Sequence, residues 1–203
     1  MSRPVLWIIG GVVGLGLIVL LAASIASEVP VDTSIGYGEV EVDGDPLPVL
    51  GDQGDVAIGF DAATVTGSDW NDVESTIGPD GRPKIVLFLA HWCPHCQNEV
   101  PLVQDWIDAG NLPDDVDMYS VTTLTDPTRS DGWPPQDWLV EEGWTVPVIM
   151  DDELNTVAIA YGLAGTPFYA VLDGDNANLQ RVSGEIGIAG LNALVDIALN
   201  STN

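Results

Sequence analysis

Hydrophobic and polar residues are arranged along this chain in segments with strand or helix spacing, after one long apolar stretch near its start. Short apolar or alternating runs predict strands, and apolar positions three or four residues apart predict helices. The expected strands are residues 85–89, 116–124, 146–150, 168–172 and 179–183, with an entry strand or hairpin over 56–66. The expected helices start near 93 and cover 135–142, 154–161 and 188–199. Strands that alternate with helices and end in a hairpin and a helix predict an α/β sandwich, with a central mixed sheet flanked by helices.

The first apolar stretch, residues 5–26, has 22 residues without a charge and follows Arg3. At 1.5 Å per residue, a helix of this length spans the roughly 30 Å of hydrocarbon in a bilayer. We therefore expect one transmembrane helix as a membrane anchor over residues 1–27, with a cytoplasmic N-terminus and the remainder extracytoplasmic. The alternative is a signal peptide cleaved near the small residues Ser24 to Ala26.

Residues 28–50 are rich in Asp, Glu, Gly and Pro and carry few large apolar residues. This composition predicts a flexible acidic linker, although the alternation from Tyr37 to Val42 permits a short strand. The remaining residues, 51–203, are enough for one domain with a single core.

The net charge of −26 narrows the possible partners. Arg3 is the only one of the five basic residues that lies before residue 26, and all 31 acidic residues lie after it. The chain after residue 26 therefore carries 31 acidic and four basic residues. Such a balance argues against nucleic-acid binding. It fits either general solubility in a saline habitat or attraction of a basic protein, such as a c-type cytochrome precursor, which salt screens beyond about 8 Å.

The stretch KIVLFLAHWCPHCQNEVP, residues 84–101, contains both cysteines of the chain. A buried strand is expected to lead into a helix at Cys93, with Pro94 in its first turn, where proline is well tolerated. The free amides and the dipole of the helix then stabilise the thiolate of Cys93. Cys96 lies one turn further, close enough to form a disulfide. We expect Cys93 as nucleophile and Cys96 as resolving thiol, without a cofactor; a structural staple is the weaker alternative, because so short a loop restricts the unfolded chain little.

Several motifs around this pair resemble the thioredoxin superfamily. WCxxC follows an apolar strand, Pro101 lies eight residues after the first cysteine, and Gly165-Thr166-Pro167 precedes a strand. Glu99, in the pattern CxxCxxExP, together with the N-terminal apolar segment, is similar to membrane-anchored proteins of the TlpA/ResA type. The resemblance covers residues 51–203 and implies a thioredoxin-like fold and a thiol-disulfide oxidoreductase acting on protein dithiols or disulfides.

The resemblance also implies roles for residues outside the pair. A cis peptide before Pro167 is expected to face the cysteines and to leave the Thr166 backbone free to pair with a substrate strand; Pro147 is a second candidate for a cis peptide. Glu99 is expected to tune the cysteines or relay a proton, unless it is only a solvated helix residue. Leu87 stands where thioredoxins carry a buried Asp, which puts more weight on Glu99 or on water.

Three further residues near the cysteines are candidates. Pro94-His95 is the dipeptide of oxidising relatives resembling DsbA, and the resemblance implies that His95 favours the thiolate; the alternative is an exposed histidine without a role. Trp92 is expected at the rim of the active site, in contact with substrate, rather than purely in the core. His91 is either a second active-site residue or only a rim residue.

The direction of exchange stays open at this point. The family as a whole implies a reductase, often serving cytochrome c maturation, whereas Pro94-His95 implies an oxidant of secreted proteins; either needs a membrane redox partner to reset the pair. Copper or other metal delivery is the alternative function, because His91, Cys93, His95 and Cys96 are potential ligands. So short a run does not readily surround a tetrahedral metal ion, and we expect no resident metal.

Overall fold

The structure is a computed structural model that describes residues 35–201. The expected membrane anchor, residues 1–27, lies outside this range, as does the start of the expected linker. Within residues 35–201, no helix is long and apolar enough to cross a membrane.

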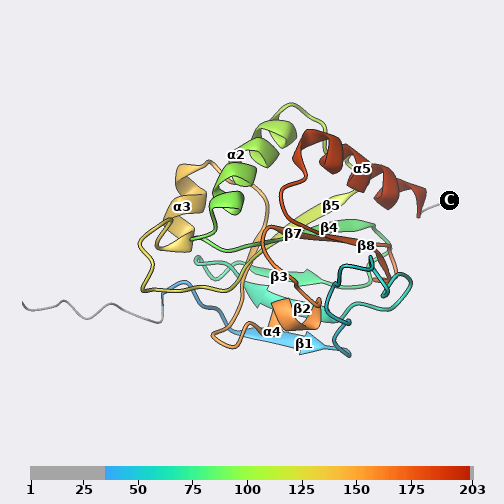
Figure 1. Cartoon of the computed structure of the whole chain (residues 1–203), viewed down its shortest axis with the longest axis horizontal. Coiled ribbons are helices and arrows are strands. Elements are labelled where there is room, and N and C mark those ends of the chain that lie inside the picture. Colours follow the sequence, from blue (N-terminus) through green and yellow to red (C-terminus); the bar gives the residue numbers. More distant parts are fainter. Residues whose placement is uncertain (1–34, 202–203) are drawn as a thin grey trace, which may run out of the picture. The chain divides into compact units, whose positions relative to one another are not determined.

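A five-stranded mixed sheet forms the centre of the fold, with strand order β6-β5-β4-β7-β8 (Figure 1). Strands β4, β5 and β6 run parallel, and β7 and β8 are antiparallel to their neighbours. The elements are β1 Val40–Asp43, β2 Thr64–Ser68, β3 Glu74–Ile77, β4 Lys84–Leu89, α2 Pro94–Asp108, β5 Asp117–Thr122, α3 Pro135–Glu141, β6 Val148–Met150, α4 Thr156–Ala160, β7 Phe168–Leu172, β8 Asn178–Ser183 and α5 Gly187–Asn200. The α/β arrangement around a mixed sheet is confirmed.

Strand β4 lies between two hydrophobic cores, and its continuous apolar run follows from this position. Ile85, Leu87 and Leu89 belong to the core under α2 and α5. Val86 and Phe88 point to the opposite face, into a core formed with β2, β3 and α4. Since successive side chains of a strand point to opposite faces, a strand buried on both sides has no polar alternation. Leu87 is therefore a core residue beneath the helix that carries the cysteines.

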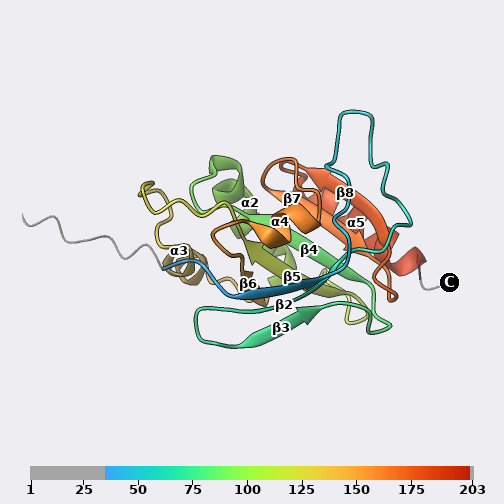
Figure 2. The ribbon, with the colours of Figure 1, turned by 90° about the horizontal axis from the view of Figure 1, so that it is seen from below.

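A second sheet of three antiparallel strands, in the order β1-β2-β3, covers the other face of the central sheet together with α4 (Figures 1 and 2). Strand β1 pairs with β2 from Val40 opposite Gly67 to Asp43 opposite Thr64. Leu47 is buried as well. The expected boundary at residue 51 is therefore corrected, because the part of the expected linker from β1 onward is folded into the domain. The composition of this segment hid a strand whose partner lies some twenty residues away in sequence.

The segment before β2 differs from the strand or hairpin expected at 56–66. Strand β2 begins only at Thr64, and β3 was not predicted. The preceding residues are held instead by a buried ion pair, in which Arg181 of β8 contacts Asp55 at 2.6 Å and both side chains are fully buried. Arg181 also donates to the carbonyls of Pro48 and Tyr161, at 2.8 Å each. The residues before β2 are therefore bound to the sheet through this ion pair, although they do not form a regular strand.

Candidate active site

Cys93 is the N-cap residue of α2, and Pro94 is at the first helical position. Its backbone is extended, its amide donates to Ala90 O at 3.0 Å, and its carbonyl accepts from Gln97 at 3.0 Å. Helix α2 therefore starts where the sequence predicts, directly after β4 and a short connection. The free amides of its first turn point toward the Cys93 end, a position that favours an anionic sulfur.

The sulfur of Cys93 lies against the loop before β7. Its Sγ donates to the carbonyl oxygen of Thr166 at 3.3 Å. The peptide between Thr166 and Pro167 is cis, as expected, whereas the peptide before Pro147 is not among the cis bonds of residues 35–201. A second cis peptide, between Trp133 and Pro134, was not predicted. The Cys93 thiol is thus hydrogen-bonded to the Thr166 backbone, which was expected to be free to pair with a substrate strand.

The two cysteines are free thiols that differ in accessibility. Cys93 is 6% exposed, whereas Cys96 is completely buried. Burial raises the pKa of Cys96 to about 12, and the neighbouring Cys93 acts in the same direction. Cys96 therefore keeps its proton at neutral pH, and only Cys93 can be reached from outside. This difference matches the expected roles of nucleophile and resolving thiol.

Glu99 lies one turn after Cys96 and is 2% exposed, so the alternative of a solvated helix residue is wrong. Its Oε1 accepts hydrogen bonds from the Tyr169 hydroxyl at 2.9 Å, from Ile186 N at 3.0 Å and from Gly187 N at 3.3 Å. Burial raises the pKa of Tyr169, and the adjacent Glu99 raises it further, so the phenol stays protonated and donates.

His95 has a specific partner, although it is largely exposed. Its Nδ1 donates to Glu185 Oε1 at 2.5 Å, and Asn98 donates to the same oxygen at 3.3 Å. The hydrogen bond from His95 lowers the pKa of Glu185. The expected effect of His95 on the Cys93 thiolate stays a prediction; the structure adds that this histidine binds a carboxylate.

His91 is 1% exposed and connects the active site to the loop between β5 and α3, residues 123–134, which we call the β5–α3 loop. Asp126 N donates to Nε2 at 3.2 Å, so the ring proton is on Nδ1, which donates to Asp131 O at 2.7 Å. Burial lowers the pKa of His91, although both backbone contacts counteract it. His91 is thus a buried neutral imidazole, neither a rim residue nor a free metal ligand.

Trp92 holds the same loop from the next position in sequence. Its Nε1 donates to Leu124 O at 2.7 Å. The guanidinium of Arg129 lies 4.1 Å from the centre of the indole ring, a cation–π geometry. The side chain is half-buried against the core under α2, so Trp92 is both a rim and a packing residue.

Sequence reasoning missed Tyr169, Glu185 and the β5–α3 loop as parts of this site. For Tyr169 a signal was available, because a tyrosine in the continuous apolar run of the predicted strand 168–172 is expected to be buried. A tyrosine facing a core usually has a partner for its hydroxyl. No local pattern pointed to Glu185 or to the loop, because their contacts with α2 join distant parts of the chain.

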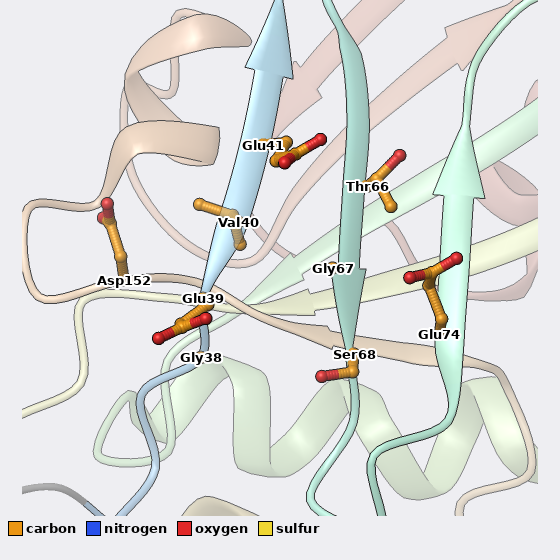
Figure 3. A pocket seen from close by; sticks show the side chains of 9 residues that line it. All are labelled: Gly38, Glu39, Val40, Glu41, Thr66, Gly67, Ser68, Glu74 and Asp152. Atoms are coloured by element: carbon orange, nitrogen blue, oxygen red, sulfur yellow. The ribbon is translucent and has the colours of Figure 1, made fainter.

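A hollow of about 680 Å³ lies over the three-stranded sheet and is shown in Figure 3. Its lining includes the carboxylates of Glu39, Glu41, Glu74 and Asp152. It belongs to the β1–β3 side of the central sheet, whereas both cysteines lie at the start of α2 on the other side. In the part of the chain from 35 to 201, no group of three or more His, Cys, Asp or Glu side chains is arranged to hold a metal ion.

This geometry defines a class of protein: a thioredoxin-like α/β fold with a dithiol at the start of the helix after the central strand. The chain belongs to the Redoxin family, whose sequence profile matches residues 44–185. The fold is similar to that of StoA from Bacillus subtilis, with a TM-score of 0.53, 19% identity and coverage of 68% of this chain and 98% of the other. It is also similar to a DsbF homologue from Corynebacterium diphtheriae, with a TM-score of 0.55, 18% identity and coverage of 67% and 85%.

Among curated proteins, the chain is similar to the thiol:disulfide interchange protein HelX of Rhodobacter capsulatus. The two are 29% identical over 107 residues, which is 53% of this chain and 55% of HelX. The match thus spans about half the length of that relative.

Proposed function

We propose that this protein is a thiol-disulfide oxidoreductase that exchanges disulfides with protein substrates. One observation carries the proposal: of the two cysteines, Cys93 at the start of α2 is partly accessible, while Cys96 is buried one turn behind it. Membership of the Redoxin family and the similarity to HelX, which is named a thiol:disulfide interchange protein, support it.

In the reducing direction, the Cys93 thiolate attacks one sulfur of a substrate disulfide, and the other substrate sulfur leaves as a thiolate. Cys96 then loses its proton and attacks the Cys93 sulfur of the mixed disulfide. The Cys93–Cys96 disulfide forms, the second substrate thiolate leaves, and two electrons have passed to the substrate. The reverse sequence oxidises a substrate dithiol. Once Cys93 no longer donates to Thr166 O, that carbonyl can accept from an amide of an extended substrate.

Reduction of insulin by dithiothreitol, followed by turbidity, tests this function. The protein should accelerate the reaction, and Cys93→Ser should return it to the uncatalysed rate. Cys96→Ser should accumulate a covalent adduct with insulin on a non-reducing gel, whereas Cys93→Ser should form none. Tight copper binding without any insulin reduction would overturn the proposal in favour of metal delivery.

The direction of exchange depends on the reduction potential of the Cys93–Cys96 disulfide. We expect a potential well above that of thioredoxin, which is about −270 mV, because Pro94-His95 and the helix terminus favour the reduced form. Equilibration with glutathione buffers measures it. A value below about −250 mV would remove the oxidase option and leave a reductase.

We further propose that the domain is extracytoplasmic and held at the cell membrane by residues 5–26, with a membrane redox partner. Protein substrates of this compartment are secreted proteins or c-type cytochrome precursors, and the strong negative charge supports a basic partner. Alkaline extraction of membranes and protease protection test the topology. A mature N-terminus after Ala26 in the soluble fraction would show a cleaved signal peptide instead.

A further inference from the structure

The resolving step requires a proton to leave a sulfur that burial strongly disfavours as an anion. Cys96 is completely buried, so water does not reach it freely. Glu99 is the nearest carboxylate along the helix, since residues three apart on a helix are neighbours on one face. The acceptor therefore needs one carboxylate oxygen that is free and turned toward Cys96.

All three hydrogen bonds that the structure gives the Glu99 carboxylate end on Oε1. One comes from Tyr169 on β7, and two come from the backbone of Ile186 and Gly187, where α5 begins. Two amides at a helix start favour a negative charge, and the phenol adds a third donor. Oε1 is thus fixed from two elements, which leaves Oε2 as the oxygen able to accept a proton.

We propose that Tyr169 is a positioning residue for disulfide exchange: it fixes Oε1 of Glu99 so that Oε2 takes up the Cys96 proton during resolution. The inference rests on the proposed function and deepens it. In this step the S–H bond of Cys96 breaks and an O–H bond forms on Oε2. The Cys96 sulfur then bonds to Cys93, the substrate sulfur leaves with its electron pair, and Glu99 later releases the proton to water.

Several titratable groups surround Glu99 and enter any pH profile. Cys96 lies on the same helix, Tyr169 on β7, and Glu185 directly before Ile186 in the connection from β8 to α5. Cys96 as well as Glu99 raises the pKa of Tyr169, so the phenol keeps its proton while it is bonded to Glu99 at 2.9 Å. Glu185 is itself bonded to His95, and the variants below leave that pair intact.

The test uses 5,5′-dithiobis(2-nitrobenzoic acid) as a substrate that reports each step. Attack by Cys93 releases a first coloured thiolate, and attack by Cys96 on the mixed disulfide releases a second. We expect Tyr169→Phe to leave the first phase unchanged, to slow the second about tenfold at pH 7, and to shift its pH profile to higher pH. The matched control is Tyr161→Phe, which removes another buried hydroxyl, bonded to Ala63 O at 3.2 Å in the other core, and should change neither phase.

Two comparisons separate positioning from packing. Glu99→Gln should slow the second phase at least as much, and adding Tyr169→Phe to it should slow the phase no further. A wild-type second phase in Tyr169→Phe, or equal slowing of both phases, would overturn the inference. If Tyr169→Phe does not fold, Glu99→Asp replaces it, because the shorter side chain cannot reach the three donors and present Oε2 together; an unchanged second phase would refute the idea. A wild-type protein that releases only one thiolate would instead refute the proposed function itself.

Discussion

The two histidines beside the nucleophile have the same distance in sequence from Cys93 and opposite environments. His91, two residues before it, is buried and neutral, with both ring nitrogens bonded to the backbone of the β5–α3 loop. His95, two residues after it, is 69% exposed and binds the carboxylate of Glu185. One histidine therefore stabilises the structure of the loop, and the other forms an exposed pair with a carboxylate.

This difference shows that the residues that stabilise the structure around an active site can be distinct from those that affect its charge. His91 and Trp92 hold the loop next to the active site through contacts made in a dry environment, where unpaired polar groups are costly. The His95–Glu185 pair is exposed, so solvent weakens it, and it can influence the nearby thiolate without supporting the fold.

The largest expected effect comes from removing the buried histidine. His91→Ala leaves the amide of Asp126 and the carbonyl of Asp131 without their partners and opens a cavity. We expect the free energy of unfolding of the reduced protein to fall by about 1–3 kcal/mol, measured by urea denaturation at pH 7.5. His95→Ala is the control and should not change it measurably. Equal losses in the two variants would contradict the distinction between them.

A second effect is the dependence of stability on pH. Since burial lowers the pKa of His91 in the folded protein, the unfolded chain binds a proton first as the pH falls. The stability contributed by neutral His91 is therefore complete above its ordinary pKa of about 6.5 and is lost as the pH falls through the folded value. Denaturation at several pH values between 7.5 and 5.5 measures the slope. We expect a smaller slope in His91→Gln, and identical slopes would exclude His91 as the cause.

The dithiol region was largely predictable from sequence because its determinants are local. The apolar run before Cys93 predicts the strand, and the proline after it predicts the start of the helix. The helical spacing that follows predicts the helix itself, so all three signals lie within a few residues of each other. The hairpin of β7 and β8 was equally local, because a short turn rich in Asp and Gly joins two strands that are adjacent in sequence. In the same way, glycine and proline around residue 166 marked the loop that faces the cysteines.

The remaining features depend on contacts between distant residues. Strand β1 and the Asp55–Arg181 pair are held by partners far along the chain, so composition made this region resemble a linker. The alternatives for His91, His95 and Glu99 were open because sequence spacing alone does not show which of these side chains is buried. Only the packed structure shows that His91 faces the β5–α3 loop while His95 faces Glu185.

A smaller effect is expected on the buried side from the cation–π contact. Arg129→Ala removes the guanidinium over Trp92, and at so exposed a site this should lower the free energy of unfolding by about 0.5 kcal/mol. Arg129→Lys keeps a cation that can reach the ring and should lose less. A loss as large as that of His91→Ala would mean that the loop is held mainly by Arg129.

The smallest expected effect concerns the exposed side and appears in the reduction potential rather than in stability. In the wild-type protein, the carboxylate of Glu185 binds His95 two residues after Cys93, so it places a negative charge close to the dithiol, where it disfavours the Cys93 thiolate. Glu185→Gln removes that charge and stabilises the reduced form, so the potential should rise by on the order of 10 mV in glutathione buffers at pH 7. Glu141→Gln on α3 removes the same charge from an exposed position and is the control. Equal shifts in both variants would assign the effect to net charge; a shift in Glu185→Gln alone would show that the carboxylate beside His95 acts locally on the dithiol.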